Sequence, residues 1–559
     1  MPRFTVEEKS LLAPFVTDTD GDIFAVTALQ GIVGAVYARY SRAPGGFRET
    51  LLKEFIKAGA IDAAKAQDLI ERVLIAYGDD SVGELEGAHL SFENISILAT
   101  KEIEDRRIGG SPIEQSTRYV FYDQKDQDGN YRYYRDPAVM ASPFAQEYVE
   151  TMDAIFGAYC ALVEPMKAYY SGLKPLEEAE YDINGDGVKE KWADCIDEKM
   201  RKSFTITYNA DIRSKACDSL RALLPVATKT NVGIFGNGRF FQTVLTHCYS
   251  HPLPEAQDIA RRSHEQLGRV IPRYVKRAKP NEYAMAGRER MKALAAMLFA
   301  NIEPRNEERT TLLDRGEDAV AARLGADAIS ATAVSSALRD EEDALTISLM
   351  LYPFLRHPLR QIREEVRTMD EATRRAIIAA YVGDRKTRRD RPGRAFEAGY
   401  PYTFDLLTDF GTYKDLERHR MMTQSRQAFT PALGFNMPPD LVAAGHDARA
   451  RECVERANAL YELIKADFPE QAAYATLHGS LVRWSCGIND RALMHMIELR
   501  TQPAGHPTYR KVCQEMHRKV SERSVWRGEA IAFADHNDYF WSRADSEARQ
   551  RVKEAALEK

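Results

Sequence analysis

The chain has few cysteines, and they are not arranged to bind metal or to cross-link the fold. Its 559 residues include seven cysteines, an odd number, and none of them forms a CxxC pair. This spacing argues against a zinc ribbon and against a disulfide scaffold. Reduced thiols are typical of the cytoplasm, so we expect a cytoplasmic protein with no metal site.

Long hydrophobic runs and a large excess of one charge are also missing. The longest early apolar run, "FAVTALQGIVGAVYARY", contains Gln30 and is too short to span a bilayer, and no signal peptide is evident. The net charge of −6 provides no general attraction to nucleic acid or to an anionic membrane. A phosphate ligand would therefore need a local basic pocket.

Helical periodicity dominates what is present. The segments "GGFRETLLKEFIKAG", "AAKAQDLIERVLIAY" and "FAQEYVETMDAIFGAYCALVEPMKAYYSGL" carry apolar residues at i, i+3, i+4 and i+7. Shorter β-rich pieces, "GAHLSFENIS", "YPYTFDLL" and "SLVRWSC", predict strands between the helices. The pattern predicts an α/β (α+β) protein.

The order of these segments is weakly repeated along the chain. The first half ends in "GNGRFFQTVLTHCYSHPLPEAQDIARR" and the second in "GINDRALMHMIELRTQPAGHPTYRKV", and both place Asn-x-Arg before an apolar helix and a His-Pro turn. We therefore predict two related domains, at 15–300 and 308–545, joined by the charged, Ala-rich stretch near 295–315.

Two local motifs have more than one interpretation. "DINGDGVKE", from Asp182 to Glu190, resembles the start of a calcium loop, but its twelfth position is Ala193, so it is either a polar loop or a weak calcium site. "GDRKTRRDRPGR", from Gly383 to Arg394, is either a solvated loop or a phosphate-binding loop. The negative net charge of the chain argues against a role of this basic segment in nucleic-acid binding.

The segment "LERHRMMTQSRQAF" contains a cationic cluster, Arg418, His419 and Arg420. On an extended or turning segment, Arg418 and Arg420 are expected to point together and His419 to point away. Arginine suits bidentate phosphate binding, so the cluster is either an anion site or surface charge.

A second candidate lies in "IEQSTRYVFYD" of the first half. On an extended strand Glu114, Ser116 and Arg118 would share one face, where a hydroxyl beside a guanidinium suits phosphate. The alternative is an ordinary surface strand.

A third candidate is the helix "INDRALMHMIELR". Asn489 and Arg500 are about three turns apart, so they share a face with Leu493 and Met496. An arginine on an otherwise apolar face needs an anion or acceptor, so Arg500 is the strongest candidate, with a structural salt bridge as the alternative.

Together these motifs resemble the flavin-dependent thymidylate synthases. The resemblance covers most of the chain, and each half resembles the family separately. The resemblance implies two tandem domains, each helix-rich with a central, mostly antiparallel sheet. It implies FAD as cofactor, and conversion of dUMP to dTMP with methylenetetrahydrofolate and NADPH as co-substrates. The family forms tetramers that bind their ligands where subunits meet.

The resemblance also implies roles for individual residues. Arg500 would activate the uracil ring. The residues implied for dUMP are Glu114, Ser116, Arg118, Arg221 and Arg418, and those implied for FAD are Ser81, Arg418, His419, Arg420, Asn489, Arg491 and His495.

Each half lacks part of the family pattern. The first half has Asp105, Arg106 and Arg107 in place of Arg-His-Arg, and Cys248 in place of the activating arginine. The second half has Ala428 and Thr430 in place of Ser-x-Arg, and Ala473 in place of Arg221. These losses are complementary, so we hypothesise one composite site per chain, with a homodimer imitating the family's tetramer.

Two other functions fit the same motifs. One is a flavin-dependent one-carbon transferase that makes a hydroxymethyl pyrimidine nucleotide. The other is a non-catalytic nucleotide- or flavin-binding paralogue, which is suggested by departures such as Asp79, Asp105 and Asp415.

Overall fold

The computed structural model describes residues 4–41, 44–57, 60–71, 80–106, 108–184, 186–313, 331–384, 393–397 and 402–541. The chain divides into two compact units. Unit 1 comprises Met1–Ile95, Ala99–Gln115 and Thr230–Glu282, and unit 2 comprises Ser96–Leu98, Ser116–Lys229 and Tyr283–Lys559. These units are defined by packing and not by the weak sequence repeat. The predicted boundaries of the two related domains, 15–300 and 308–545, therefore stay a prediction.

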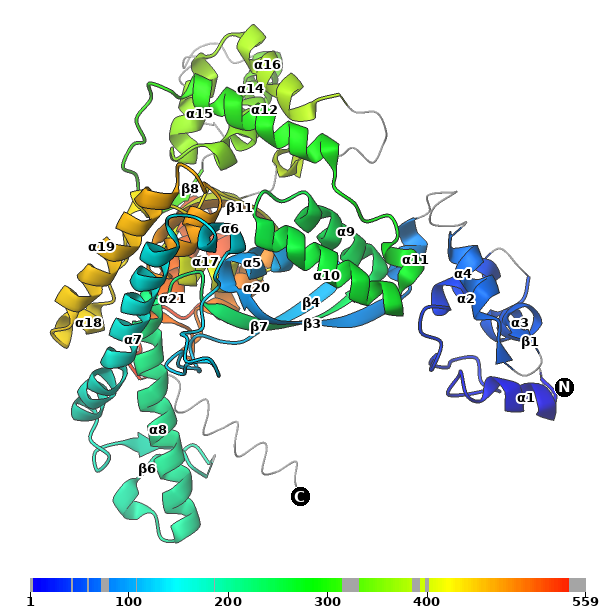
Figure 1. The fold of residues 1–559 in the computed structure, drawn as a ribbon, viewed down its shortest axis with the longest axis horizontal. Coiled ribbons are helices and arrows are strands. Elements are labelled where there is room, and N and C mark those ends of the chain that lie inside the picture. Colours follow the sequence, from blue (N-terminus) through cyan, green and yellow to red (C-terminus); the bar gives the residue numbers. More distant parts are fainter. Residues whose placement is uncertain are drawn as a thin grey trace. The chain divides into compact units, whose positions relative to one another are not determined.

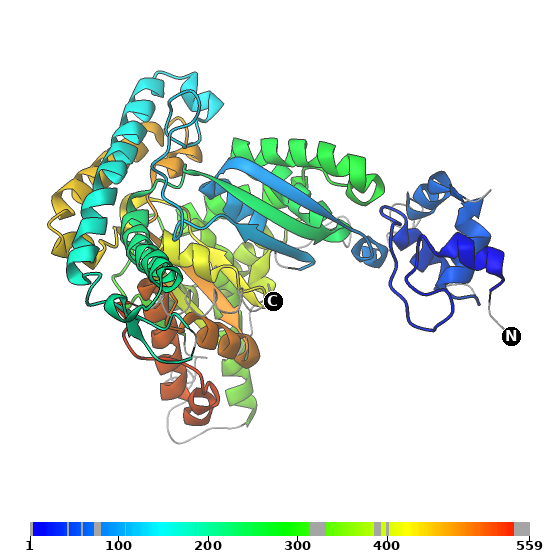
Figure 2. The same ribbon diagram turned by 90° about the horizontal axis from the view of Figure 1, so that it is seen from below.

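Unit 1 contains a three-stranded sheet covered on one face by helices. Its strands are β3 (Gly87–Ser96), β7 (Lys229–Asn237) and β4 (Gly110–Glu114), in the order β3-β7-β4. The helices α9 (Gly238–Tyr249) and α10 (Pro254–Val270) cover the face that buries Phe92, Val232 and Ile234 (Figures 1 and 2). The apolar alternation of these strands produces this one-sided burial.

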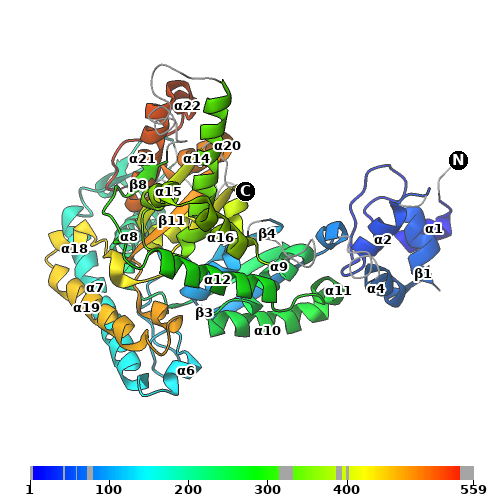
Figure 3. The ribbon, with the colours of Figure 1, turned by 90° about the horizontal axis from the view of Figure 1, so that it is seen from above.

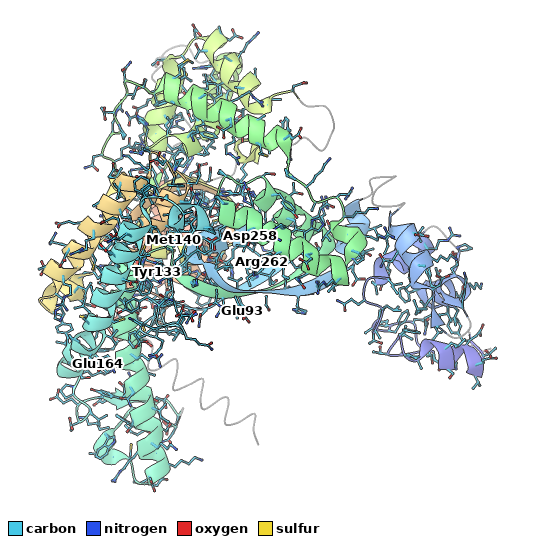
Figure 4. The ribbon with its side chains drawn as sticks, viewed as in Figure 1. Glu93, Tyr133, Met140, Glu164, Asp258 and Arg262 are labelled. Carbon is cyan, nitrogen blue, oxygen red and sulfur yellow. The ribbon has the colours of Figure 1, made fainter. Side chains whose placement is uncertain are left out.

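The other elements of unit 1 are short. They are α1 (Val6–Leu12), α2 (Val33–Tyr40), α3 (Phe47–Thr50), the π-helix η1 (Leu51–Phe55), β1 (Ile56–Lys57), β2 (Ala60–Ile61), α4 (Ala63–Glu71), η3 (Asp80–Glu84), α5 (Ile97–Glu104) and α11 (Pro272–Val275). On α10, Asp258 and Arg262 form an exposed ion pair four residues apart (Figure 4), as expected for a solvated helix face.

Unit 2 is built around a four-stranded antiparallel sheet. Its order is β10 (Met422–Arg426), β11 (Leu481–Ile488), β9 (Tyr402–Asp409) and β8 (Thr310–Leu312). The register of the two central strands runs from Leu481 opposite Asp409 to Ile488 opposite Tyr402. Both strands are buried along nearly their whole length, so both faces of the sheet are covered.

Helices form two groups in unit 2. The long helices α7 (Ala145–Leu173), α8 (Glu198–Leu220) and α19 (Asp447–Ile464) pack with α7 in the middle (Figures 1 and 3). A second group forms its own apolar core, which includes Met291, Ile347 and Ile362. This group consists of α12 (Glu282–Leu298), α14 (Ala331–Leu351), α15 (Leu359–Thr368) and α16 (Glu371–Val382).

The remaining elements of unit 2 are short or follow the sheet. The helices are α6 (Pro137–Met140), α17 (Phe410–Leu416), α18 (Pro439–Ala443), α20 (Asp490–Arg500), α21 (Pro507–Arg523) and α22 (Val525–Ala530). The single turns are η4 (Trp192–Asp194), η5 (Arg221–Leu223), η6 (Tyr352–Phe354), η7 (Arg394–Glu397), η8 (Pro431–Leu433) and η9 (Gln471–Ala475), and β5 (Glu180–Tyr181) pairs with β6 (Glu190–Lys191).

The two sheets share one order of elements. A strand, a helix and a second strand (β3-α5-β4 and β9-α17-β10) are followed later by a central strand and two helices (β7-α9-α10 and β11-α20-α21). An asparagine caps the first of those helices in both cases. Asn237 Oδ1 accepts from the Phe240 amide at 2.8 Å, and Asn489 Oδ1 accepts from the Ala492 amide at 3.0 Å.

Several sequence predictions are confirmed. "GAHLSFENIS" is β3, "YPYTFDLL" and "SLVRWSC" supply most of β9 and β11, and the long third segment is α7. The resulting fold is mixed α/β, with several small antiparallel sheets.

Two predictions about the fold need correction. "GGFRETLLKEFIKAG" is not one helix, because α3 passes into the π-helix η1 and then into β1. The expected linker at 295–315 contains the end of α12 and the strand β8, which pairs with β9 and so belongs to the second sheet.

None of the helices in the described part of the chain combines the length and the apolar composition that a bilayer-spanning segment needs.

Candidate functional site

Arg118 is held in a buried network in unit 2 that joins the two halves of the sequence. Its Nε and Nη2 donate to the two carboxylate oxygens of Asp218 at 2.9 and 3.0 Å. Its Nη1 donates to Tyr509 Oη at 3.1 Å, and its guanidinium lies 5.6 Å from the centre of the Tyr509 ring. Burial opposes the charge of Arg118, but Asp218, Tyr509 and Asp415 together outweigh burial and raise the pKa of the guanidinium.

Arg221 makes the second link between the halves. Its Nη1 donates to Asp415 Oδ2 at 3.1 Å, and only 3% of the residue is exposed. Its Nη2 is buried and has no hydrogen-bond partner among the described residues. Gly411 makes room for this group, because a Cβ there would lie 3.1 Å from Nη2. A buried N–H without a partner is costly, which makes this atom a candidate contact for a ligand.

Asp415 lies among several positive charges. Burial would raise the pKa of its carboxyl, but the neighbouring guanidinium groups outweigh burial and hold the pKa well below its usual value. These groups belong to four arginines, Arg221, Arg118, Arg418 and Arg500. Two come from each half of the sequence, so the structure brings together the arginines of the predicted composite site.

His419 and Arg500 form a direct pair at the edge of this cluster. Arg500 Nε donates to His419 Nε2 at 2.8 Å, and its guanidinium lies 5.5 Å from the centre of the Tyr509 ring. Burial and the charge of Arg500 lower the pKa of His419 to about 3. The imidazole is therefore neutral and accepts through Nε2, so its proton is on Nδ1. Arg500 is half-buried, and its Nη groups remain for other contacts.

The cavity that adjoins Asp218 is small. Its volume is about 10 Å³, room for roughly one water molecule, and its lining includes Lys215 and Phe540. In the described structure Arg118 is paired with Asp218 and Arg221 with Asp415. A phosphate-bearing ligand would have to compete with these carboxylates for the guanidinium groups.

The predicted strand through Ser116 and Arg118 is wrong. β4 ends at Glu114, and residues 117–119 form a turn in which Ser116 Oγ accepts from the Arg118 amide at 3.2 Å. Serine favours such local turns over an extended ladder, so the three side chains do not share a strand face. Glu114 belongs to unit 1, where Thr100 donates to it at 3.3 Å and Lys101 lies 3.6 Å away.

The segment that contains Arg418, His419 and Arg420 places its histidine inward. The segment turns directly after α17, and His419 is buried whereas Arg420 is exposed. The imidazole therefore faces inward to Arg500, whereas the expectation that Arg418 and Arg420 point together stays a prediction.

The residues implied for FAD form a partly exposed set. Arg420 and Arg491 are exposed, and within the described residues no ion pair or hydrogen bond engages their side chains. The exposed His495 lies against His419, with ring centres 5.8 Å apart. The side chain of Ser81 lies outside the described part of the structure. Two available guanidinium groups suit a diphosphate, so this set fits the phosphate portion of FAD.

The counterpart of this site in unit 1 has different chemistry. Arg106 Nη2 donates to His247 Nδ1 at 3.2 Å, and His247 Nε2 lies 3.0 Å from Glu102. Burial and the charge of Arg106 lower the pKa of His247 to about 4, so the ring is neutral. Cys248 is buried, and burial raises the pKa of its thiol to about 12, so the thiol carries no charge. Arg107, the other arginine of this segment, lies outside the described residues.

The calcium-like loop is closed by its own hydrogen bonds. Asp182 accepts from the Gly187 amide at 3.1 Å, and Glu190 accepts from the Ile183 amide at 3.0 Å. No group of three or more metal-ligating side chains is present in the described ranges. The basic run from Gly383 to Arg394 lies largely outside those ranges.

Two residues of the network were not identified from the sequence. Asp218 lies three residues before Arg221, and Tyr509 follows the His-Pro turn of the second half. A carboxylate one helical turn before a candidate anion-binding arginine was the available signal for Asp218. For Tyr509, the sequence contained no signal beyond the repeated His-Pro turn.

Comparison with known proteins places the chain in a family. The model of the thymidylate synthase complementing protein family matches residues 30–273 and 351–524. A UPF0159 protein of Chlamydia muridarum is 34% identical over 571 residues, covering 98% of this chain and 99% of the relative. One from Chlamydia pneumoniae is 35% identical, with 98% of both covered, and one from Thermoplasma acidophilum is 28% identical, with 94% and 99% covered. The chain therefore belongs to the thymidylate synthase complementing protein family.

Proposed function

We propose that the protein is a flavin-dependent thymidylate synthase-like enzyme that converts dUMP to dTMP at one composite site per chain. The observation that carries this proposal is the cluster of Arg118 and Arg221 from the first half with Arg418 and Arg500 from the second, all acting on Asp415. If the two halves had lost their functional residues independently, we would not expect two complementary pairs of arginines to remain together in one place.

The phosphate of dUMP would be bound by Arg118 and Arg221. Both are buried, and Arg221 Nη2 lacks a partner within the described structure. A dianionic phosphate could replace the carboxylates of Asp218 and Asp415 as counterion, with charge-assisted hydrogen bonds to the planar guanidinium groups.

Arg500 would act on the uracil ring. Its Nε is fixed by His419, which leaves the Nη groups to stabilise negative charge that develops when N3 loses its proton. The neutral His419 is a positioning residue in this arrangement, because it holds the guanidinium without adding a competing charge.

FAD fits the exposed cationic set next to this pair, with Arg420 and Arg491 available for its diphosphate and His495 beside His419. Bound flavin would supply the redox chemistry, with NADPH as reductant and methylenetetrahydrofolate as one-carbon donor. The chain's own contribution is to position the ligands and to stabilise charge. We further propose that the chain forms a homodimer that imitates the tetramer of the flavin-dependent thymidylate synthases.

The experiment that tests this proposal is a flavin and NADPH assay on the purified protein. The protein is expected to bind FAD, to show the visible flavin band, and to oxidise NADPH faster when dUMP is present. A protein that takes up no flavin on reconstitution, and whose NADPH oxidation does not respond to dUMP, would remove the enzyme proposal. Mass analysis of the nucleotide product separates dTMP from a hydroxymethyl product.

A second candidate function is nucleotide binding without catalysis. It is favoured by Asp218 and Asp415, which neutralise the arginines, and by the small cavity beside Asp218. Growth rescue of a thymidine auxotroph distinguishes the two functions, because only the enzyme would support growth without thymidine.

A further inference from the structure

A large pocket lies in unit 2 among residues that the proposed reaction does not use. Its volume is about 610 Å³, within the range of small-molecule sites. Its apolar lining comprises Phe299 at the end of α12, Phe354 and Leu355 after α14, Leu407 on β9 and Leu433 in η8. The pocket is therefore large enough for a ligand with an apolar body.

Two buried polar side chains that line this pocket each have an atom without a partner. Arg483, which is 3% exposed, donates from Nη1 to Asp405 at 3.0 Å, and its Nε has no hydrogen-bond partner among the described residues. His357, which is 5% exposed, bonds through Nε2 to the carbonyl of Ile302, and its Nδ1 has no partner in the same part of the chain.

These two atoms have complementary hydrogen-bonding roles. The His357 Nε2 faces a carbonyl, so it carries the proton, and Nδ1 is left as an acceptor. Arg483 Nε is a donor, and the charge of its guanidinium is already balanced by Asp405, which also accepts from Tyr352 Oη at 2.7 Å. Buried polar atoms are normally satisfied, so this donor and this acceptor on two lining residues are candidate contacts for a ligand with matching groups.

The remaining charges around the pocket favour an anion. Arg356 is exposed, and no ion pair or hydrogen bond engages its side chain within the described residues. Arg305 also lines the pocket, and it forms a solvent-exposed ion pair with Glu364. Such an exposed pair is weak, so it holds the Arg305 side chain only loosely. Glu303 is the carboxylate in the lining, and Arg305 and Arg356 outnumber it there even when Arg483, which Asp405 balances, is left out.

We propose that this pocket binds a small organic anion with an apolar or aromatic body, separately from the composite arginine site. The carboxylate or phosphate of the ligand meets Arg356 and Arg305, and its body rests on Phe299, Phe354 and Leu407. An N–H or O–H of the ligand donates to His357 Nδ1, and an acceptor atom of the ligand accepts a hydrogen bond from Arg483 Nε. A carboxylate and a phosphate monoester satisfy the same guanidinium groups, so the ligand's anionic group is left to experiment.

The test is calorimetric titration of the full chain with folinic acid, an aliphatic dicarboxylate on an aromatic body, with adenosine monophosphate, a heterocyclic phosphate monoester, and with inorganic phosphate. Arg356→Gln removes a charge at the pocket without disturbing a buried contact. Ala432→Trp fills the pocket from its exposed rim, and Ala448→Trp on an exposed position of α19 is the matched control.

We expect folinic acid or adenosine monophosphate to bind the wild-type chain. Arg356→Gln should weaken that binding by about tenfold or more, the effect of losing one charge-assisted hydrogen bond. Ala432→Trp should abolish it, and Ala448→Trp should leave it unchanged. Binding of folinic acid alone identifies a carboxylate ligand, and binding of adenosine monophosphate alone identifies a phosphate monoester.

The proposal is overturned if neither organic anion binds, if inorganic phosphate alone binds, or if binding is insensitive to both pocket variants. The Arg118→Gln/Asp218→Asn variant separates this site from the proposed function. It should keep the pocket's affinity whether or not it retains dUMP binding.

Discussion

Arg118 and Asp218 form a buried ion pair, and each side chain needs the other to balance its charge. Their side chains are 11% and 12% exposed, and burial raises the pKa of Asp218 despite the arginine beside it. Removing the guanidinium leaves a carboxylate in a site from which water is largely excluded. We therefore expect Arg118→Gln to destabilise the fold by about 3–5 kcal/mol, as for other broken buried pairs.

The measurement is urea unfolding of the single variant and of Arg118→Gln/Asp218→Asn. The double variant should recover much of the lost free energy of unfolding, because it leaves two neutral amides instead of one unpaired charge. Equal destabilisation of both variants would show that Asp218 is not paired chiefly with Arg118.

Asp415 competes with any phosphate for Arg221 and its neighbours. Asp415→Asn removes the negative charge but keeps the shape, so we expect dUMP to bind about tenfold more tightly, equivalent to about 1.4 kcal/mol. Equilibrium dialysis of wild type and variant measures this change. Weaker binding in the variant would mean that Asp415 positions the arginines rather than competing with the ligand.

His419 makes stability depend on pH. Its pKa in the folded state is about 3, below the usual 6.5, so the unfolded chain takes up a proton first as the pH falls. The stabilisation is complete above pH 6.5 and decreases between 6.5 and 3, by about 2 kcal/mol at pH 5. His419→Gln should show a smaller loss of unfolding free energy between pH 7 and pH 5. Identical pH profiles would contradict a buried neutral histidine.

At the residue scale, the sequence singles out arginines that the structure brings together around Asp415, and it says less about their counterions. Arg500 was identified because a charged residue on an apolar helix face needs a partner, and the structure supplies His419 and Tyr509 as contacts. Asp218 could not be assigned to Arg118, because they are 100 residues apart and only tertiary packing joins them.

The elements of the fold were predicted where periodicity was strong. β3, β9, β11 and α7 follow directly from alternation or from a helical apolar stripe. The segment 116–119 was predicted wrongly because Ser116 forms a local turn through its hydroxyl, a contact that competes with an extended strand.

Asn489 has a structural role at the start of α20 that the resemblance did not indicate. Its side chain caps the helix as Asn237 caps α9. Replacement of either asparagine by alanine should destabilise the protein by about 1 kcal/mol in thermal or urea unfolding. Asn489→Ser keeps a capping oxygen and should retain stability. Loss of flavin binding in a stable Asn489→Ser variant would show a second role toward the cofactor, whereas full stability of Asn489→Ala would contradict the cap.

At the scale of the whole molecule, the two halves of the sequence complement each other. Arg118 bonds to Tyr509 and Arg221 bonds to Asp415, so the first half meets the second within unit 2. If both groups act within one chain, mixing the inactive Arg118→Gln/Asp218→Asn and Arg500→Gln proteins should not restore activity. Restoration on mixing would mean that the site is assembled between chains.

The central claim, one nucleotide site built from both halves, is tested most directly by calorimetric titration with dUMP. Wild-type protein and Ala432→Trp are expected to bind dUMP at the composite site with equal affinity, because the residues of that site do not line the large pocket. Arg118→Gln/Asp218→Asn in the first half and Arg500→Gln in the second should each lose binding, while both remain folded by circular dichroism. Absence of dUMP binding in the wild type, or dependence on only one half, would contradict the composite site.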